Sequence, residues 1–240
     1  MSFVGAGGKT SLLLHFAREL AAGGRAVLVT TTTKLADPRG EGGPFTRVVF
    51  RPGLARAAGP EPDEVPEPLP GVTLLVASPA DEPGKLAGIR PGSVASLRAA
   101  WPLVLVEADG SKRLPVKAPA EWEPVVPEGT DLVVGVVGLD ALGRPMDERT
   151  VHRPARFAAV SGCPAGAPIA WEHVVALARH PEGLFKGARG RRVVLLNKAD
   201  EAASLPSTAQ VEDLAADLVL LSGEREEGRF FLALRPEPPR

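Results

Sequence analysis

A glycine-rich stretch close to the N-terminus constrains the fold more than any other part of this sequence. Residues 4–11 have the sequence Val-Gly-Ala-Gly-Gly-Lys-Thr-Ser. Residues 1–4 can form only a very short first strand before the glycines. Behind them, apolar residues recur every three or four positions, which predicts a helix over residues 10–22. A strand, a glycine turn, Lys-Thr and a helix form the layout of a phosphate-binding P-loop.

The residues of this stretch suit the binding of a nucleotide and a magnesium ion. In a P-loop, backbone N–H groups and the helix N-terminus point at the phosphates, the lysine adds a charge and the threonine hydroxyl holds Mg²⁺. The usual motif has glycine at position 3, where this chain has Phe3, so other stretches must support the assignment. The candidate nucleotide-binding residues here are Gly5, Ala6, Gly7, Gly8, Lys9, Thr10 and Ser11.

The next apolar run indicates the fold class. Residues 25–30 form a buried-strand pattern after the predicted helix, and a strand-helix-strand unit implies a parallel sheet with helices on its faces. We expect an α/β fold of three layers (α/β/α), with a mostly parallel, P-loop NTPase-like sheet. A single domain should cover residues 1–240, with a small loop-rich β insertion or flap, or a plain surface excursion, at residues 45–92 and a flexible tail at residues 235–240.

Composition limits the kinds of partner and compartment. The net charge is −1 and the pI about 6.5, so no broad basic surface for nucleic acid is indicated. No apolar run reaches the roughly 18–20 residues of a membrane span, and no signal-like segment opens the chain. The only cysteine, Cys163, cannot form an internal disulfide, and we interpret it as a buried small hydrophobe rather than a reactive thiol. We therefore expect a cytoplasmic protein with neither nucleic acid nor membrane as partner.

Four consecutive threonines followed by a lysine come directly after the second predicted strand. Thr30 and Thr31 could simply reflect the preference of threonine for strands. Thr32, Thr33 and Lys34 should lie at the carboxyl end of that strand, where doubly wound folds bind ligands. We treat these three as candidate substrate or switch residues.

A second polar group follows the apolar strand predicted at residues 103–106. Glu107 and Asp109 come at its end, and a carboxylate at this place beside a P-loop orients Mg²⁺ or its water. The alternative is a simple exit from the strand through an Asp-Gly turn. Three basic residues that come next could clamp phosphates or an acidic substrate, or could be exposed loop residues without a ligand: Lys112, Arg113 and Lys117.

Further candidates follow a strand predicted at residues 132–139. The strand ends at Asp140, and His152 and Arg153 precede a proline shortly afterwards. His152 has no neighbour at metal-ligand spacing, so it is either a substrate or switch residue or a solvated or capping histidine. We include Asp140, His152 and Arg153 among the substrate or switch candidates.

The sequence Asn197-Lys198-Ala199-Asp200 follows the strand predicted at residues 192–196 and points to guanine. Asp200 could accept hydrogen bonds from N1–H and the 2-amino group of guanine, Lys198 could cover the base, and Asn197 could tie this loop to the phosphate loop. The alternative, a chance polar turn, is weakened because the chain has no other asparagine. A second guanine-contacting loop is expected at Ser222, after a last strand at residues 217–221.

Taken together, these motifs resemble the YqeC family over nearly the whole chain. Further matching pieces are Pro-Val-Lys-Ala-Pro around Lys117, Val-Gly-Leu-Asp-Ala-Leu-Gly around Asp140 and Val-His-Arg-Pro at His152. The resemblance implies a nucleotide-binding accessory factor for selenium-dependent molybdenum hydroxylases. Trp122 stands where the family is expected to favour histidine, which argues against histidine chemistry in that loop. The family's motif positions carry over to Lys9, Thr10, Glu107, Asp109, Lys117, Asp140, His152, Arg153, Asn197 and Asp200.

The motifs and the resemblance lead to one main functional hypothesis. The chain would bind a Mg²⁺-bound nucleoside triphosphate, GTP rather than ATP, and hydrolyse it slowly to support maturation of a molybdenum- or selenium-dependent hydroxylase. The alternatives are a small-molecule phosphotransferase and a nucleotide-gated chaperone that does not hydrolyse. Lys9, Glu107 and Asp109 are the catalytic candidates, and Thr10, Glu107 and Asp109 the Mg²⁺ ligands.

Overall fold

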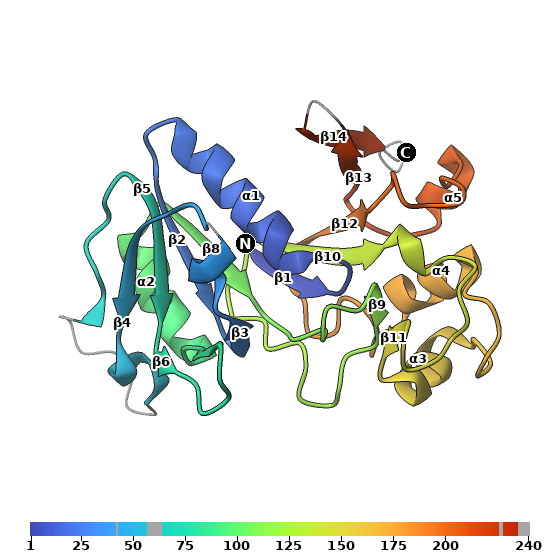
Figure 1. Cartoon of the computed structure of the whole chain (residues 1–240), viewed down its shortest axis with the longest axis horizontal. Coiled ribbons are helices and arrows are strands. Elements are labelled where there is room, and N and C mark those ends of the chain that lie inside the picture. Colours follow the sequence, from blue (N-terminus) through green and yellow to red (C-terminus); the bar gives the residue numbers. More distant parts are fainter. Residues whose placement is uncertain (42, 57–63, 226–227, 235–240) are drawn as a thin grey trace. The chain divides into compact units, whose positions relative to one another are not determined.

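The computed structural model describes residues 1–41, 43–56, 64–225 and 228–234, and Figure 1 shows its helices and strands. The chain divides into two compact units. Unit 1 consists of Met1–Phe3, Thr10–Gly110 and Val125–Thr130, and unit 2 of Val4–Lys9, Ser111–Pro124 and Asp131–Arg240. In the described part of the chain, nine strands belong to a large, mostly parallel sheet. The α/β class is therefore confirmed, whereas the single domain expected over residues 1–240 stays a prediction.

The parallel strands of unit 1 follow the order β1-β8-β2-β5-β4. β2, β5 and β8 are mostly runs of valine, leucine and other apolar residues, as is typical of parallel strands that are covered on both faces. The start of β1 pairs with the end of β8, so that Phe3 lies opposite Glu107. The bounds are β1 Ser2–Gly5, β2 Ala26–Thr31, β4 Phe45–Phe50, β5 Gly71–Val76 and β8 Leu103–Glu107.

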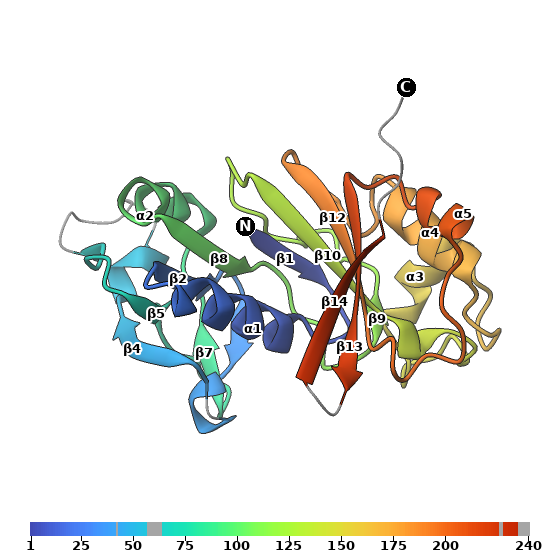
Figure 2. The same cartoon turned by 90° about the horizontal axis from the view of Figure 1, so that it is seen from above.

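Two helices cover these strands from opposite sides, as Figure 2 shows. Helix α1 (Lys9–Ala22) is where the periodicity predicts a helix, and its Leu13 and Ala17 are buried. Helix α2 (Val94–Ala100) belongs to a core that joins Leu97 to Leu28 of β2 and Val106 of β8. Alternate residues of each strand face opposite sides, so the helix-sheet-helix layering of unit 1 follows from the pattern of its sequence.

The segment 45–92, predicted as an insertion or flap, contributes to two sheets. Strands β4 and β5 extend the parallel sheet, because the buried run Gly71–Val76 pairs with β2. A separate small antiparallel sheet has the order β3-β7-β6. Its strands are β3 Lys34–Ala36, β6 Ser78–Pro79 and β7 Lys85–Ala87.

Unit 2 contains three parallel strands in the order β10-β12-β13 and an antiparallel edge strand, β14. The loop expected at Ser222 is not formed, because β13 continues through this residue and returns as β14. The predicted tail at residues 235–240 lies outside the described residues. The bounds are β10 Leu132–Gly138, β12 Arg191–Asn197, β13 Leu218–Arg225 and β14 Gly228–Leu234.

The described residues of unit 2 also form a two-stranded sheet and three α-helices. Helix α3 starts with Pro154 as its first residue and ends at Gly162, whose φ of +74° suits a helix end. Helix α5 starts with the predicted capping box of Ser207 and Gln210. Among the described residues, no helix has the length and apolarity to cross a membrane. The bounds are β9 Val116–Lys117, β11 Val151–His152, α3 Pro154–Ser161, α4 Trp171–Arg179 and α5 Thr208–Glu212.

Candidate functional site

The glycine loop between β1 and α1 has a backbone that needs glycine. Gly5, Gly7 and Gly8 have φ values of +91°, +90° and +104°, which side chains rarely allow. A Cβ atom on Gly5 would come within 2.3 Å of the Val136 carbonyl oxygen, and one on Gly7 within 2.2 Å of the Gly138 nitrogen. The irregular loop is therefore a tightly packed turn of unit 2 despite the missing first glycine.

Lys9, the first residue of α1, folds back over this loop. Its Nζ donates a hydrogen bond of 2.6 Å to the Gly5 carbonyl oxygen, and the residue is only 2% exposed. The ammonium group thus lies at the start of the helix, where backbone N–H groups have no partner within the helix. This combination of a cation and a helix N-terminus favours an anionic ligand.

Asn197, at the end of β12, holds the loop in place, as the sequence predicts. Its Nδ2 donates to the Gly7 carbonyl oxygen at 2.7 Å. Its Oδ1 accepts from Ser222 Oγ at 2.8 Å and from Arg229 Nη1 at 3.0 Å. Ser222, predicted as a nucleotide contact, is fully buried and supports Asn197. No motif in the sequence points to Arg229, because it reaches Asn197 only through the pairing of β13 with β14.

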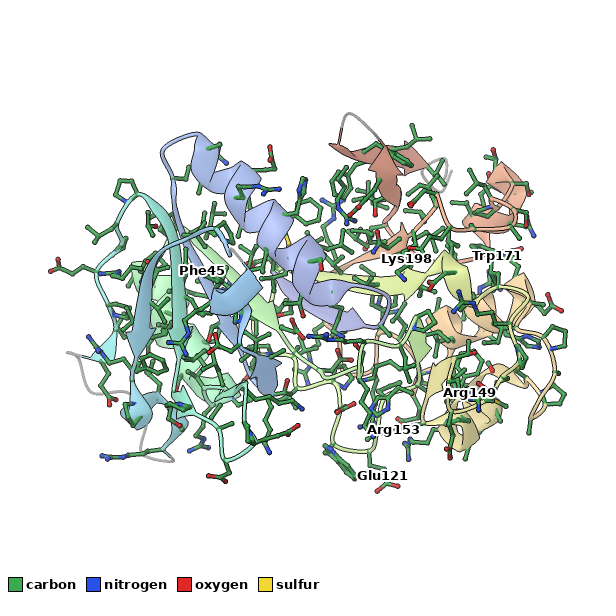
Figure 3. The ribbon with its side chains drawn as sticks, in the orientation of Figure 1. Phe45, Glu121, Arg149, Arg153, Trp171 and Lys198 are labelled. Carbon is green, nitrogen blue, oxygen red and sulfur yellow. The ribbon has the colours of Figure 1, made fainter. Side chains whose placement is uncertain are left out.

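The other two polar residues of the Asn-Lys-Ala-Asp sequence have different surroundings. Lys198, labelled in Figure 3, has a left-handed φ of +62°, and its Nζ is 2.9 Å from Oδ2 of the buried Asp140. Burial alone would lower the pKa of Lys198, but the hydrogen bond to Asp140 and the negative charges of Asp140 and Glu201 together outweigh burial and raise it. Asp200 is exposed, and its Oδ1 accepts from the Glu224 N–H at 3.0 Å. Unit 2 thus brings together Asp140, Asn197 and Lys198.

In unit 1, Thr10 and Glu107 form a pair that suits a hard cation. Thr10 Oγ1 donates to Glu107 Oε2 at 2.7 Å, and Glu107 is 6% exposed. Asp109, buried as well, follows two residues later. Hydroxyl and carboxylate oxygens are the ligands that Mg²⁺ prefers, and at triphosphate sites one or two carboxylates suffice. No cluster of three or more His, Cys, Asp or Glu side chains that could hold a metal ion occurs within the described residues.

The threonines after β2 lie against the end of β8. The Thr32 N–H donates to the Glu107 carbonyl oxygen at 3.1 Å, and Thr31 Oγ1 donates to the same oxygen at 2.9 Å. Thr33 hydrogen-bonds to Thr31. Lys34, by contrast, starts the small sheet, is exposed and has its Nζ 3.8 Å from Glu82 Oε2. The structure therefore places Thr32 and Thr33, but not the side chain of Lys34, beside the Glu107 backbone.

A buried ionic cluster in unit 2 connects the pair β9 and β11 with the loop before Pro124. Glu123 Oε2 accepts from Lys117 Nζ at 2.6 Å and from Arg153 Nη1 at 2.7 Å, and its Oε1 accepts from Arg153 Nη2 at 3.0 Å. Burial would raise the pKa of Glu123, but the hydrogen bonds from Arg153 and Lys117 lower it to about 2. Glu123 was not among the residues predicted from the sequence, where no motif marks it.

His152 lies next to this cluster, paired in register with Lys117. Burial and the charges of Arg153 and Lys117 lower the pKa of His152 to about 4, so its imidazole is neutral at pH 7. Lys112 also acts on it electrostatically. Figure 3 shows Arg153 beside the loop that carries Glu121.

The remaining predicted residues have simpler surroundings. Lys112 and Arg113 are exposed and have left-handed φ values of +50° and +61°. Ser11 is exposed in the first turn of α1. Cys163 is 1% exposed, and burial raises the pKa of its thiol, in agreement with its interpretation as a small hydrophobe.

These features define an α/β protein with a glycine loop, a lysine at the following helix start and polar residues at the ends of parallel strands. The model of the family described as YqeC protein matches residues 1–155. The chain is also 37% identical over 204 residues to the Uncharacterized protein YqeC of Escherichia coli (strain K12), which covers 82% of this chain and 75% of the relative. No solved structure matches. The chain belongs to the YqeC family, as its motifs predict.

Proposed function

We propose that this protein is of the P-loop NTPase type and binds a Mg²⁺-bound nucleoside triphosphate, with GTP preferred over ATP, and hydrolyses it slowly. The observation that carries the proposal is the 2.7 Å hydrogen bond from Asn197 to the Gly7 carbonyl oxygen. It joins a strand end of the type Asn-Lys-x-Asp to a glycine loop within one compact unit. If Asn197-Lys198-Ala199-Asp200 were only a chance polar turn, a hydrogen bond from it to the glycine loop would not be expected.

The phosphates would be held by the loop and by Lys9. When a triphosphate binds, the Lys9 ammonium group would exchange the Gly5 carbonyl oxygen for phosphate oxygens, and the backbone N–H groups at the start of α1 would donate to them. Thr10, Glu107 and Asp109 would hold Mg²⁺. The ion, when bound, neutralises charge that develops on the phosphates. Candidates for additional positive charge are Lys34, Lys112 and Arg113.

The guanine base would be recognised by residues at the end of β12. Asp200 is exposed and would accept from the N1–H and 2-amino groups, which adenine lacks as a donor pair. Lys198 would cover the face of the base, and its ion pair with the buried Asp140 would hold it there. Asn197 has all of its described hydrogen bonds directed to the protein, so its role would be to position the loop.

The proposed biological role is the one that the resemblance to the YqeC family implies. We propose that nucleotide turnover supports the maturation of a selenium- or molybdenum-dependent hydroxylase in the cytoplasm, with that hydroxylase or its maturation proteins as partners. This proposal rests on the motifs shared with the YqeC family and on the charged site of unit 2. The relative from Escherichia coli is itself named only as uncharacterized.

A second candidate function is transfer of the terminal phosphate to a small molecule. It is favoured by the charged cluster of Lys117, Glu123 and Arg153 with His152, which belongs to the same unit as the glycine loop. Release of nucleoside diphosphate only when an acceptor is added would support it. Negligible turnover, together with equal partner binding in GTP and in a non-hydrolysable analogue, would instead indicate a nucleotide-gated chaperone.

The test is calorimetric titration of GTP, GDP and ATP, each with Mg²⁺, into the wild type and Asp200→Ala. We expect the wild type to prefer GTP, and the variant to lose about tenfold or more in GTP affinity, because hydrogen bonds to a charged group contribute roughly 1.5–3 kcal/mol. ATP affinity should be unchanged. Asp213→Ala, which removes an exposed aspartate after α5, is the matched control. Equal affinities of the wild type for GTP and ATP would overturn the guanine assignment.

A further inference from the structure

Strand β4 forms one edge of the large sheet and has a groove along its unpaired side. It pairs with β5, beside which Figure 1 shows it, and no second strand among the described residues pairs with it. One wall of the groove is formed by residues 47–51 and the other by residues 65–67, all within unit 1. We call it the edge groove. Its volume is about 610 Å³, within the roughly 300–1,000 Å³ that ligand sites occupy.

The backbone of β4 offers hydrogen-bonding groups to this groove. Arg51, directly after the strand, donates its N–H to the Val76 carbonyl oxygen of β5 at 2.9 Å. Because the backbone groups of successive residues point to alternate sides of a strand, those of Val48 and Phe50 point away from β5. Both residues line the groove. An extended peptide that enters the groove can therefore add to the sheet as a further strand.

The wall opposite β4 is fixed by contacts within unit 1. Trp101 is 3% exposed, and its Nε1 donates to the Pro66 carbonyl oxygen at 2.8 Å. Val65 packs against the buried core of this unit. Arg47 Nη2 donates to the Glu67 carbonyl oxygen at 2.7 Å. The groove is thus formed before a ligand binds, which lowers the cost of ordering on binding.

Two arginines give the edge groove its charge. Arg47 and Arg51 lie on the same face of the strand, because side chains alternate between the faces. Among the described residues neither forms an ion pair, and the only carboxylate that lines the groove is the exposed Glu67.

The surroundings of Arg47 favour a ligand over a purely protective role. Basic side chains often guard edge strands against aggregation, but such a role requires only that the charge stays in water. The Nε atom of Arg47 is instead buried and has no hydrogen-bond partner within the described structure. A buried donor without a partner is costly, and an acceptor brought by a ligand would remove this cost.

We propose that the edge groove binds an acidic, extended segment of a partner protein as an additional strand of the sheet. Its backbone would bond to Val48 and Phe50, and its carboxylates to Arg47 and Arg51. The two arginines are four residues apart, roughly 13 Å along a strand, so two acidic side chains at the same spacing match them. A second copy of this chain fits less well, because antiparallel pairing of β4 with β4 would bring the arginines of both copies together.

The experiment measures the binding of three labelled octapeptides to the full chain by fluorescence anisotropy at constant ionic strength. The acidic peptide alternates glutamate and valine, the basic peptide has lysine in place of glutamate, and the interrupted peptide has proline in place of valine. Proline keeps the negative charge but prevents strand pairing. We expect the acidic peptide to bind saturably and at least tenfold more tightly than the other two.

Hydrogen exchange locates the bound peptide. The acidic peptide should slow exchange of the Val48 and Phe50 amides at least tenfold, because their N–H groups gain an acceptor. Val48→Pro removes one of these N–H groups at an edge position, where proline is tolerated, and should abolish peptide binding.

Charge variants test the arginines separately from the backbone. Arg47→Gln and Arg51→Gln should each weaken binding of the acidic peptide several-fold, and the double variant at least tenfold. Arg18→Gln, which alters an exposed arginine of α1 in the same unit, is the matched control and should leave binding unchanged.

Several results would overturn the proposal. These are equal binding of the three peptides, unchanged exchange at Val48 and Phe50, or an equal loss of binding in Arg18→Gln and the double variant. Dimerisation of the full chain that Val48→Pro abolishes would assign the edge to a second copy and overturn the proposal as well. The inference does not depend on nucleotide binding. Lys9→Ala should leave peptide binding unchanged, and failure of GTP binding would overturn only the nucleotide function.

Discussion

At the scale of single residues, Lys9 gives the clearest test of the glycine loop. Lys9→Ala removes the ammonium group that now donates to Gly5. We expect a loss of about 2 kcal/mol or more in triphosphate affinity, roughly thirtyfold, because a charge-assisted contact to phosphate disappears. Calorimetric titration with Mg·GTP measures this change in affinity. Arg18→Ala, on the exposed side of α1, is the control. Unchanged affinity would identify the loop as a structural turn.

A second prediction at this scale concerns Thr10 and Glu107. Thr10→Val keeps the shape of the side chain but removes the hydroxyl that donates to Glu107 Oε2. If both oxygens hold Mg²⁺, the magnesium concentration needed for half-maximal GTP turnover should rise about tenfold, the effect of losing roughly 1.4 kcal/mol. Thr10→Ser, which restores the hydroxyl, should recover most of the effect. The same magnesium dependence in all three proteins would remove Thr10 from the metal site.

At the scale of elements, Asn197 links β12, β13 and β14 to the glycine loop. Asn197→Ala would remove three hydrogen bonds, those of the buried Gly7 carbonyl oxygen, the buried Ser222 Oγ and the partly exposed Arg229 Nη1. We expect the free energy of unfolding to fall by roughly 2–4 kcal/mol, since each unsatisfied buried group costs about 1–3 kcal/mol and relaxation recovers part of it. Urea unfolding measures this loss.

Ser222→Ala is the matched comparison for this prediction. It removes one hydrogen bond of the three and should cost roughly 1 kcal/mol. Equal losses in the two variants would mean that the bond from Asn197 to Gly7 contributes little to stability. In that case the tie between β12 and the loop would be a minor contact.

The elements also show what the sequence can and cannot predict. Buried apolar runs locate β2, β8, β10 and β12 to within one or two residues, because strands covered on both faces have a continuous apolar pattern. β14 was not predicted although it contains the apolar run Phe-Phe-Leu-Ala-Leu. Arg229 could not be predicted as a partner of Asn197, because their contact arises from the long-range pairing of β13 with β14. Helix α3 was not predicted from the sequence.

The residues of the candidate site likewise divide into those that a local motif predicts and those that only long-range pairing brings together. Residues with chemically specific local motifs, such as Asn197 and Glu107, lie at strand ends as predicted. Glu123 could not be predicted as the centre of an ionic cluster, because its partners Lys117 and Arg153 meet only through the pairing of β9 with β11. Long-range pairing of short strands leaves no local signal.

At the scale of the whole molecule, the ionic cluster should make stability depend on pH in two steps. The pKa of His152 is lowered from 6.5 to about 4, so the unfolded chain binds the proton more readily, and stability falls as pH decreases from 6.5 to 4. The pKa of Glu123 is lowered from 4.5 to about 2, so its stabilising effect is present above pH 4.5 and is lost as pH falls toward 2.

His152→Gln should separate these two steps. Glutamine does not titrate, so the decline between pH 6.5 and 4 should flatten, while the decline caused by Glu123 below pH 4.5 should persist. Because His152 is partly exposed, solvent screening should keep the first slope below that of one full proton. Urea unfolding at intervals from pH 3.5 to 7.5 measures both, with His15→Gln on α1 as the control. A decline as steep in His152→Gln as in the wild type would show that other groups titrate there.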